Sequence, residues 1–209
     1  MRGDTQMNWP VLDRQELGRG AISTFVDETV AVPSGDTMRR QFLIHPGAVG
    51  IVAWDEVRDE VVVLRQYRHA VGAELVEIPA GLLDVEGEDY LAAAQRELAE
   101  EAELAAAQWS VLADIFTTPG ASAESTRIFL ARDLAATPRP AGFILEAEEA
   151  HMRVERVARE ELVDAIFAGR CQSPALVTGV LALETALLSG RLDQLRPADA
   201  PWPARQWRR

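Results

Sequence analysis

The chain has 209 residues, of which 48% are hydrophobic and 26% are charged, the proportions of an ordinary globular protein rather than a disordered or fibrous one. Its length suits one large domain, or one domain with a small appendage, and is sufficient to bury a core of enzyme size. The formal net charge of -12 argues against a nucleic-acid groove, where a basic patch supplies most of the affinity.

Residues 1–45 are predicted to form a small antiparallel β appendage. Between about Gly18 and His45 the pattern indicates two or three short strands, interrupted by the turn-rich sequence V-P-S-G-D at 32–36. The strand signals become stronger after this point, and we expect the main domain to begin at residue 46.

Strongly apolar runs predict three strands of the main sheet, at residues 47–54, 60–67 and 75–78. The third run leads through a Pro-Ala-Gly turn into a helix that is predicted over residues 89–102. One stripe of this helix is expected to pack on a sheet, because apolar residues repeat at intervals of three and four, at Leu91, Ala94, Leu98 and Ala102.

The remaining elements complete a domain over residues 46–190. Further strands are predicted at 109–116, 126–131 and 152–157. Two helices follow, at 159–168 and 174–188, the second with Ser173 at its N-cap position and proline at its first position. Residues 191–209 contain several prolines and are expected to form an irregular tail. This order predicts an α/β fold in which helices cover both faces of a mixed sheet, an α/β/α sandwich.

The end of the helix predicted over residues 89–102 carries a cluster of charged side chains, Arg96, Glu97, Glu100 and Glu101. Glu97 faces both later glutamates, and like charges at this spacing cost about 0.2–0.5 kcal/mol each unless a cation lies between them. Mg²⁺ is the obvious candidate, because it takes oxygen ligands and typically sits between carboxylates and substrate phosphates. For any one of these residues, a solvated helix face is an equally good interpretation.

The segment from Gly81 to Leu104, G-L-L-D-V-E-G-E-D-Y-L-A-A-A-Q-R-E-L-A-E-E-A-E-L, resembles the Nudix box of the Nudix hydrolase family. Two positions depart from the common pattern. The loop between Gly81 and Glu88 is one residue longer than usual, which leaves the spacing of the charged residues intact. Glu103 stands where the family usually has a glycine in a left-handed turn, and a residue other than glycine costs about 1 kcal/mol if the turn is kept.

Four features outside the box resemble the ADP-ribose pyrophosphatase branch of this family. They are the N-terminal β appendage and the runs R-Q-Y-R-H at 65–69, E-I-P-A-G-L-L-D at 77–84 and T-T-P-G-A-S-A-E at 117–124. In this family a proline at the position of Pro119 is associated with ADP-ribose preference. The resemblance covers most of residues 18–190. It implies the Nudix α/β/α sandwich and the Mg²⁺-dependent hydrolysis of ADP-ribose to AMP and ribose 5-phosphate.

The resemblance also implies a set of metal ligands. The carbonyl of Ala80 and the carboxylates of Glu97 and Glu101 would hold Mg²⁺, with Glu100 as a further ligand or water-holding residue. Mn²⁺, Zn²⁺ or another divalent ion stays open as an alternative. Three residues of the box would be structural, with Glu88 bracing Arg96 beneath the metal and glycine shaping the loop: Gly81, Glu88 and Arg96.

Substrate contacts and the catalytic base are implied elsewhere in the chain. Arg40 and Arg68 would contact the pyrophosphate or the terminal ribose, with Arg65 in place of Arg68 if the strand register differs. The resemblance implies Leu82 and Pro119 as further substrate-binding residues. The base would come from the acidic segment at 146–151, where the residue of first choice is Glu149 and that of second choice is Glu148.

Two alternative functions and a dimeric assembly are also consistent with the sequence. A Nudix hydrolase of another nucleotide sugar or of oxidised nucleoside triphosphates is one alternative, and a nucleotide-binding module without catalysis is another. The resemblance implies a homodimer through the N-terminal strands, whose exposed edges favour pairing. The single cysteine, Cys171, allows no intrachain disulfide, and no signal-peptide or membrane-spanning pattern occurs, so we expect a cytoplasmic enzyme with a small-molecule substrate and neither nucleic-acid nor membrane partners.

Overall fold

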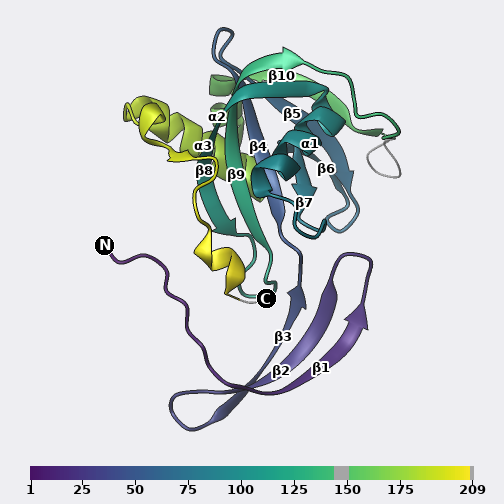
Figure 1. The fold of residues 1–209 in the computed structure, drawn as a ribbon, viewed down its shortest axis with the longest axis vertical. Helices are drawn as coiled ribbons and strands as arrows, with labels where there is room; N and C mark the ends of the chain where they lie inside the picture. Colours follow the sequence, from purple (N-terminus) through teal and green to yellow (C-terminus); the bar gives the residue numbers. More distant parts are fainter. Residues whose placement is uncertain (144–150, 208–209) are drawn as a thin grey trace. The chain divides into compact units, whose positions relative to one another are not determined.

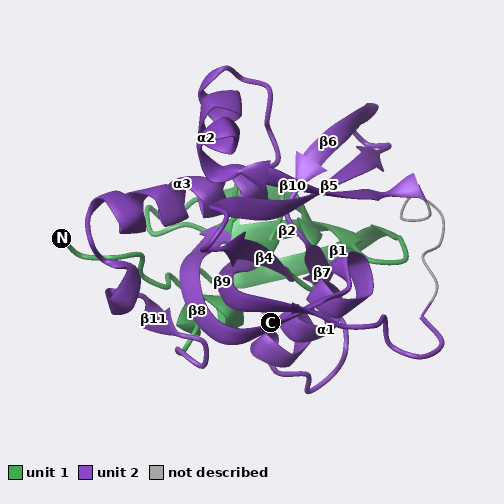
Figure 2. Ribbon diagram, turned by 90° about the horizontal axis from the view of Figure 1, so that it is seen from above, with its two compact units in different colours: residues 1–47, 116–125, 201–209 green, residues 48–115, 126–200 purple. Residues whose placement is uncertain are grey.

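A computed structural model describes residues 1–143 and 151–207 of the chain. The elements are labelled along the chain in Figure 1, and they divide between two compact units that Figure 2 distinguishes by colour. The first unit consists of residues 1–47, 116–125 and 201–209, and the second of residues 48–115 and 126–200. No helix of the described residues is both long and apolar enough to cross a membrane.

The first unit is built on a three-stranded antiparallel sheet in the order β1-β2-β3 (Figure 1). Its strands are β1 (Val11–Arg19), β2 (Thr24–Ala31) and β3 (Thr37–Ile44). The expectation that strands begin at about Gly18 was wrong for β1, which begins seven residues earlier, at Val11. Every residue of β1 is exposed, so the strand lacks the alternation of buried and exposed side chains that would have revealed it.

Two later segments of the chain join this first unit. The segment at 116–125 pairs with the end of β3, because Leu43 donates to the carbonyl of Ala121 at 3.0 Å and accepts from the amide of Ala123 at 2.8 Å. The C-terminal tail stacks Trp207 on Phe116, with ring centroids 6.2 Å apart. The tail is not wholly irregular, since it contains the short elements η2 (Leu192–Gln194), β11 (Arg196–Pro197) and η3 (Pro203–Gln206).

The second unit contains the larger sheet, in the order β10-β5-β4-β9-β8-β11, with β6 paired to β5 and β7 paired to β4. β4 runs parallel to β9 and antiparallel to β5 and β7, so the sheet is mixed, as predicted. Its strands are β4 (Ala48–Asp55), β5 (Glu60–Arg68), β6 (Ala73–Glu77), β7 (Ala80–Leu82), β8 (Leu104–Phe116), β9 (Ser125–Ala136), β10 (Arg153–Ala158) and the short β11.

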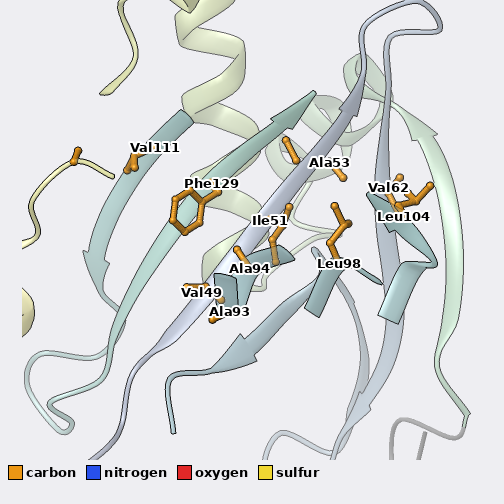
Figure 3. Packing of buried hydrophobic residues seen from close by; sticks show 12 residues of the cluster. Val49, Ile51, Ala53, Val62, Ala93, Ala94, Leu98, Leu104, Val111 and Phe129 are labelled. Atoms are coloured by element: carbon orange, nitrogen blue, oxygen red, sulfur yellow. The ribbon is translucent and has the colours of Figure 1, made fainter. Parts of the chain in front are cut away.

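Alternate residues of the central strands face two separate hydrophobic clusters. Along β4, Val49 and Ile51 pack with α1 (Tyr90–Ala102), whereas Val52 and Trp54 pack with residues of α2 (Arg159–Phe167) and α3 (Pro174–Leu188). Successive strand residues point to opposite faces, so helices cover the sheet on both sides. Figure 3 shows the cluster that α1 forms with the strands. The predicted α/β/α sandwich is therefore confirmed.

The helix predictions agree with the structure more closely than the strand predictions do. The α3 helix has the predicted bounds, and α1 begins directly after Asp89, whose carboxylate accepts from the amides of Leu91 and Ala92. The β8 strand starts five residues earlier than predicted. The prediction missed these residues because they are mostly alanine, which has low strand propensity. Close approach of α3 to β4 depends on Gly179, where a Cβ atom would lie 2.6 Å from a methyl group of Val52.

Candidate functional site

The candidate site is formed by the C-terminal half of α1 and the short strand β7. The apolar stripe of α1 is anchored in the core, with Ala93, Ala94 and Leu98 fully buried beneath the helix. The charged residues of the same helix lie off this stripe and meet the backbone of β7, which pairs with β4 through Gly50 and Ala80. The ligand candidates are thus mounted on two elements whose positions are set by the sheet.

Arg96 is the hub of the charged cluster. Its Nε and Nη2 atoms donate to the two carboxylate oxygens of Glu88, each at 3.0 Å. Its Nη1 atom donates to Glu97 at 2.6 Å and to Glu100 at 3.0 Å. The hydrogen bonds to Glu88, followed by the charge of Glu97, raise the pKa of Arg96 above its ordinary value. The guanidinium therefore stays charged and holds three carboxylates together.

Glu97 and Glu101 close against the backbone of β7. A Cβ atom at Gly81 would lie 1.9 Å from the carboxyl carbon of Glu97, so the carboxylate fills the space that any larger residue would need. The amide of Ala80 donates to Oε2 of Glu101 at 2.9 Å. These contacts place the two glutamates next to the residues of the Pro-Ala-Gly turn, which is where the sequence predicted a metal site.

The donor set of this cluster fits a hard divalent cation. Glu100 and Glu101 are 8% and 6% exposed, and burial of negative charge is costly unless it is compensated. Three carboxylates, those of Glu88, Glu97 and Glu100, share the single guanidinium of Arg96. A fourth, that of Glu101, accepts from the amide of Ala80, and oxygen donors of this kind suit Mg²⁺. Within residues 1–143 and 151–207, no three acidic, histidine or cysteine side chains already converge as a ligand set.

Glu103 keeps the left-handed turn that ends α1. Its φ of 55° and ψ of 40° lie in the left-handed region, and its amide donates to the carbonyl of Ala99 at 3.2 Å. The turn expected of the family glycine is therefore present without glycine. An L-residue in this conformation costs about 1–2 kcal/mol, which other contacts of the last turn must offset.

The two candidate arginines of β5 are paired with carboxylates. Arg68 donates to Glu77 at 3.1 and 2.6 Å, and Arg65 donates to Glu155 at 2.8 and 2.9 Å. Either arginine would need to exchange or share its partner in order to bind an anionic substrate. These pairings were missed in the sequence because they depend on the register of β5 with β6 and β10 rather than on local spacing.

The structure brings together only part of the predicted site. Eight predicted residues lie in the second unit around α1 and β7: Ala80, Gly81, Leu82, Glu88, Arg96, Glu97, Glu100 and Glu101. Arg68 lies in the same unit, on β5. Arg40, exposed on β3, and Pro119, exposed in the segment at 116–125, belong to the first unit. Glu148 and Glu149 lie outside the described residues.

One contact of the last helical turn was not predicted from the sequence. Arg139 follows β9 and donates through Nε to the backbone carbonyl of Glu100 at 2.8 Å. It lies in the segment T-P-R-P, which shows no periodic pattern. No local signal in the sequence could have linked it to a helix more than thirty residues earlier.

Comparisons with known proteins agree with this arrangement. The profile of the NUDIX domain matches residues 44–171. An ADP-ribose pyrophosphatase from Mycobacterium tuberculosis (strain ATCC 25618 / H37Rv) is 37% identical over 195 residues, which cover 93% of this chain and 91% of that protein. A methanol dehydrogenase activator from Bacillus methanolicus is 33% identical over 128 residues, 61% of this chain and 68% of that protein. A solved structure described as an ADP compounds hydrolase superposes with a TM-score of 0.72 at 18% identity, covering 91% of this chain and all of that one, and shares the fold.

Replacement of Gly81 by alanine should weaken metal binding without destabilising the fold. The new methyl group displaces the carboxylate of Glu97, which is the flexible end of a side chain, so the unfolding temperature should stay close to that of the wild type. Affinity for Mg²⁺, measured by calorimetry, should fall about tenfold or more. The matched control is Gly18→Ala, where a Cβ atom meets nothing within 4 Å. Unchanged Mg²⁺ affinity in the Gly81 variant would contradict the site.

Proposed function

The chain belongs to the NUDIX domain family, and we propose that it hydrolyses the pyrophosphate bond of ADP-ribose to AMP and ribose 5-phosphate. The observation that carries the proposal is the packing of Glu97 and Glu101 against β7, with Glu100 held beside Glu97 by Arg96. It occurs in a chain that aligns with an ADP-ribose pyrophosphatase over nearly its whole length. Pro119 and the N-terminal strands add support from outside the box.

Enzymes of this family generally use a divalent metal ion, and Mg²⁺ is the ion that the oxygen donors suit best, with Mn²⁺ as an alternative. Glu97, Glu101 and the carbonyl of Ala80 would hold it, and Glu100 would be a further ligand or would hold a water molecule. When bound, the ion would neutralise the pyrophosphate and activate a water molecule for attack. Arg96, braced by Glu88, would keep Glu97 and Glu100 oriented.

Arginines would recognise the anionic substrate. The planar guanidinium of Arg68 or Arg40 suits phosphate oxygens and ribose hydroxyl groups, and about two-fifths of the Arg68 side chain is exposed beside Glu77. Arg65 is the alternative on the same strand. Leu82 follows Gly81 directly in β7 and would contact the substrate beside the metal.

A glutamate of the acidic segment at 146–151 would act as the base. Glu149 is the first choice and Glu148 the second, because the segment is rich in carboxylates and lies in the sequence between β9 and β10. The base would take the proton of the attacking water molecule as its oxygen bonds to one phosphorus, while the bond from that phosphorus to the bridging oxygen breaks and the other phosphate leaves with that oxygen.

The N-terminal sheet is proposed to form a homodimer. Its outer strand β1 pairs only with β2 within the described residues, and it exposes apolar side chains at Val11, Leu12 and Leu17. An exposed strand edge with apolar residues readily pairs with a second copy.

The activity is tested by incubating the enzyme with ADP-ribose and Mg²⁺ and measuring the products by chromatography. Equal amounts of AMP and ribose 5-phosphate should form, and a chelator should abolish the reaction. The Glu101→Gln variant should lose about 100-fold or more in kcat with its fold preserved, whereas Glu160→Gln, on the exposed face of α2, should behave as the wild type.

A panel of nucleotide sugars and oxidised nucleoside triphosphates distinguishes the alternatives in the same assay. A higher kcat/KM for another nucleoside diphosphate derivative would replace ADP-ribose as the substrate. Tight binding of ADP-ribose without any product would instead favour a non-catalytic binding module, and a Glu101→Gln variant with normal turnover would refute the metal ligands.

The identity of the base is tested by three single substitutions in the acidic segment. Glu149→Gln should lower kcat about 10²–10⁴-fold and leave Mg²⁺ affinity unchanged, because it removes the proton acceptor and no metal ligand. Glu146→Gln, in the same segment, is the control. If Glu148→Gln lowers kcat and Glu149→Gln does not, then Glu148 is the base.

The dimer is tested by light scattering. The wild type should have twice the monomer mass, and Leu12→Lys on β1 should shift it towards the monomer because a charge is placed on the pairing strand. Val57→Lys, at an exposed turn of the second unit, is the control and should remain dimeric. A monomeric wild type would exclude the proposed assembly.

A further inference from the structure

The last turn of α1 has an unfavourable charge arrangement. The C-terminal end of a helix carries partial negative charge, and cations rather than anions are stabilising there. This turn instead carries or adjoins three carboxylates, those of Glu100, Glu101 and Glu103, and α1 has no basic residue in its own last turn. Arg96 pairs with Glu100 and the amide of Ala80 with Glu101, which leaves the charge of Glu103 and of the helix end to be compensated from another part of the chain.

Arg139 supplies that cation from the segment that follows β9. Its Nε atom donates to the backbone carbonyl of Glu100 at 2.8 Å, and its Nη1 atom lies 2.9 Å from Oε1 of Glu103. The same segment approaches through its backbone, because the amide of Thr137 donates to the carbonyl of Glu103 at 2.9 Å. One guanidinium therefore satisfies both a free carbonyl of the helix end and the side chain of the capping residue.

The position of this contact coincides with the departure from the family pattern. Glu103 occupies the left-handed position where glycine is usual, and it adopts that conformation with a φ of 55°. A glycine would need no partner there, whereas the glutamate is held by Arg139 through its side chain and by Thr137 through its carbonyl. The arginine contact thus acts on the residue whose conformation is strained.

We propose that Arg139 is a positioning residue that holds Glu103 in the left-handed turn and so fixes the last turn of α1, which bears Glu100 and Glu101. The effect on cation binding rests on the proposed metal function, whereas the contact of Arg139 with Glu103 does not. Glu100 is fastened at both ends, with its carboxylate on Arg96 and its carbonyl on Arg139. Loss of Arg139 frees this turn and weakens cation binding without direct loss of a ligand.

The solvent exposure of the Glu103–Arg139 ion pair indicates that it affects local order more than global stability. The side chains of Glu103 and Arg139 are 53% and 35% exposed, and exposed ion pairs contribute little to global stability. The carbonyl that Arg139 binds belongs to Glu100, which is buried. The arginine should therefore affect the order of one turn more than the unfolding of the whole domain.

A double-mutant cycle between Arg139→Ala and Glu103→Gly tests the inference. Two readouts are measured without substrate: amide hydrogen exchange at residues 101–104, and the Mn²⁺ dissociation constant by electron paramagnetic resonance. In the wild-type background, Arg139→Ala should raise both the exchange rate and the dissociation constant about tenfold. In the Glu103→Gly background the same substitution should change each by a clearly smaller factor, about threefold or less, because glycine keeps the turn unaided and only the hydrogen bond to the Glu100 carbonyl is then lost.

The controls separate positioning from general destabilisation. Arg132→Ala removes another ion pair, with Glu56, from the strand that precedes Arg139 and should alter neither readout. Arg139→Lys keeps the positive charge but reaches only one of the two partners, so its effects should lie between those of the wild type and Arg139→Ala. This variant decides the matter if Arg139→Ala does not fold.

Several outcomes would overturn the inference. Equal effects of Arg139→Ala in the two backgrounds would mean that Glu103 is not the residue through which it acts. Faster exchange with unchanged Mn²⁺ affinity would leave Arg139 a merely structural residue. A wild type that binds no Mn²⁺ would refute the proposed metal function, and the exchange cycle would still show whether Arg139 holds the turn.

Discussion

The concentration of carboxylates at one end of α1 is the constraint on which the rest of the site depends. Glu97, Glu100 and Glu101 lie within two turns of one another, at the helix end that already carries partial negative charge. Two of them are nearly buried. Such an arrangement persists only because cations and amide donors surround it, and its excess of negative charge over the one central guanidinium is the physical reason to expect a divalent ion.

The α1 helix has two distinct faces, an apolar one that packs in the core and a charged one that forms the site. The apolar stripe of α1 is packed into the cluster around β4, so the helix cannot rotate to expose its carboxylates (Figure 3). Arg96 then ties three carboxylates together. The backbone of β7 meets Glu101 at Ala80 and Glu97 at Gly81. The strand β7 is paired to β4, and α1 packs on β4. The same strand therefore positions both elements that form the site.

Local patterns in the sequence were sufficient for the features that depend on a single element. The bounds of α3 and the buried stripe of α1 follow from periodicity and capping. The fully exposed β1 was misjudged because it has no buried face, and the start of β8 was missed because it is rich in alanine.

Features that depend on distant parts of the chain could not be predicted. The carboxylate partners of Arg65 and Arg68 are set by strand register, and Arg139 reaches the end of α1 from beyond β9. No spacing rule connects such residues, since their proximity is a product of the sheet topology. Glu97, Glu100 and Glu101 could be proposed as ligands because they share one helix, whereas the contact of Arg139 could not be predicted because it comes from beyond β9.

A crystal structure of the enzyme with Mg²⁺ and a non-hydrolysable ADP-ribose analogue tests the central claim most directly. The account predicts an ion bound to the carboxylates of Glu97 and Glu101 and to the carbonyl of Ala80, facing the diphosphate of the analogue, with Arg96 still paired to Glu88. Well-ordered carboxylates that point into solvent, with the analogue bound elsewhere and no ion beside α1, would contradict it.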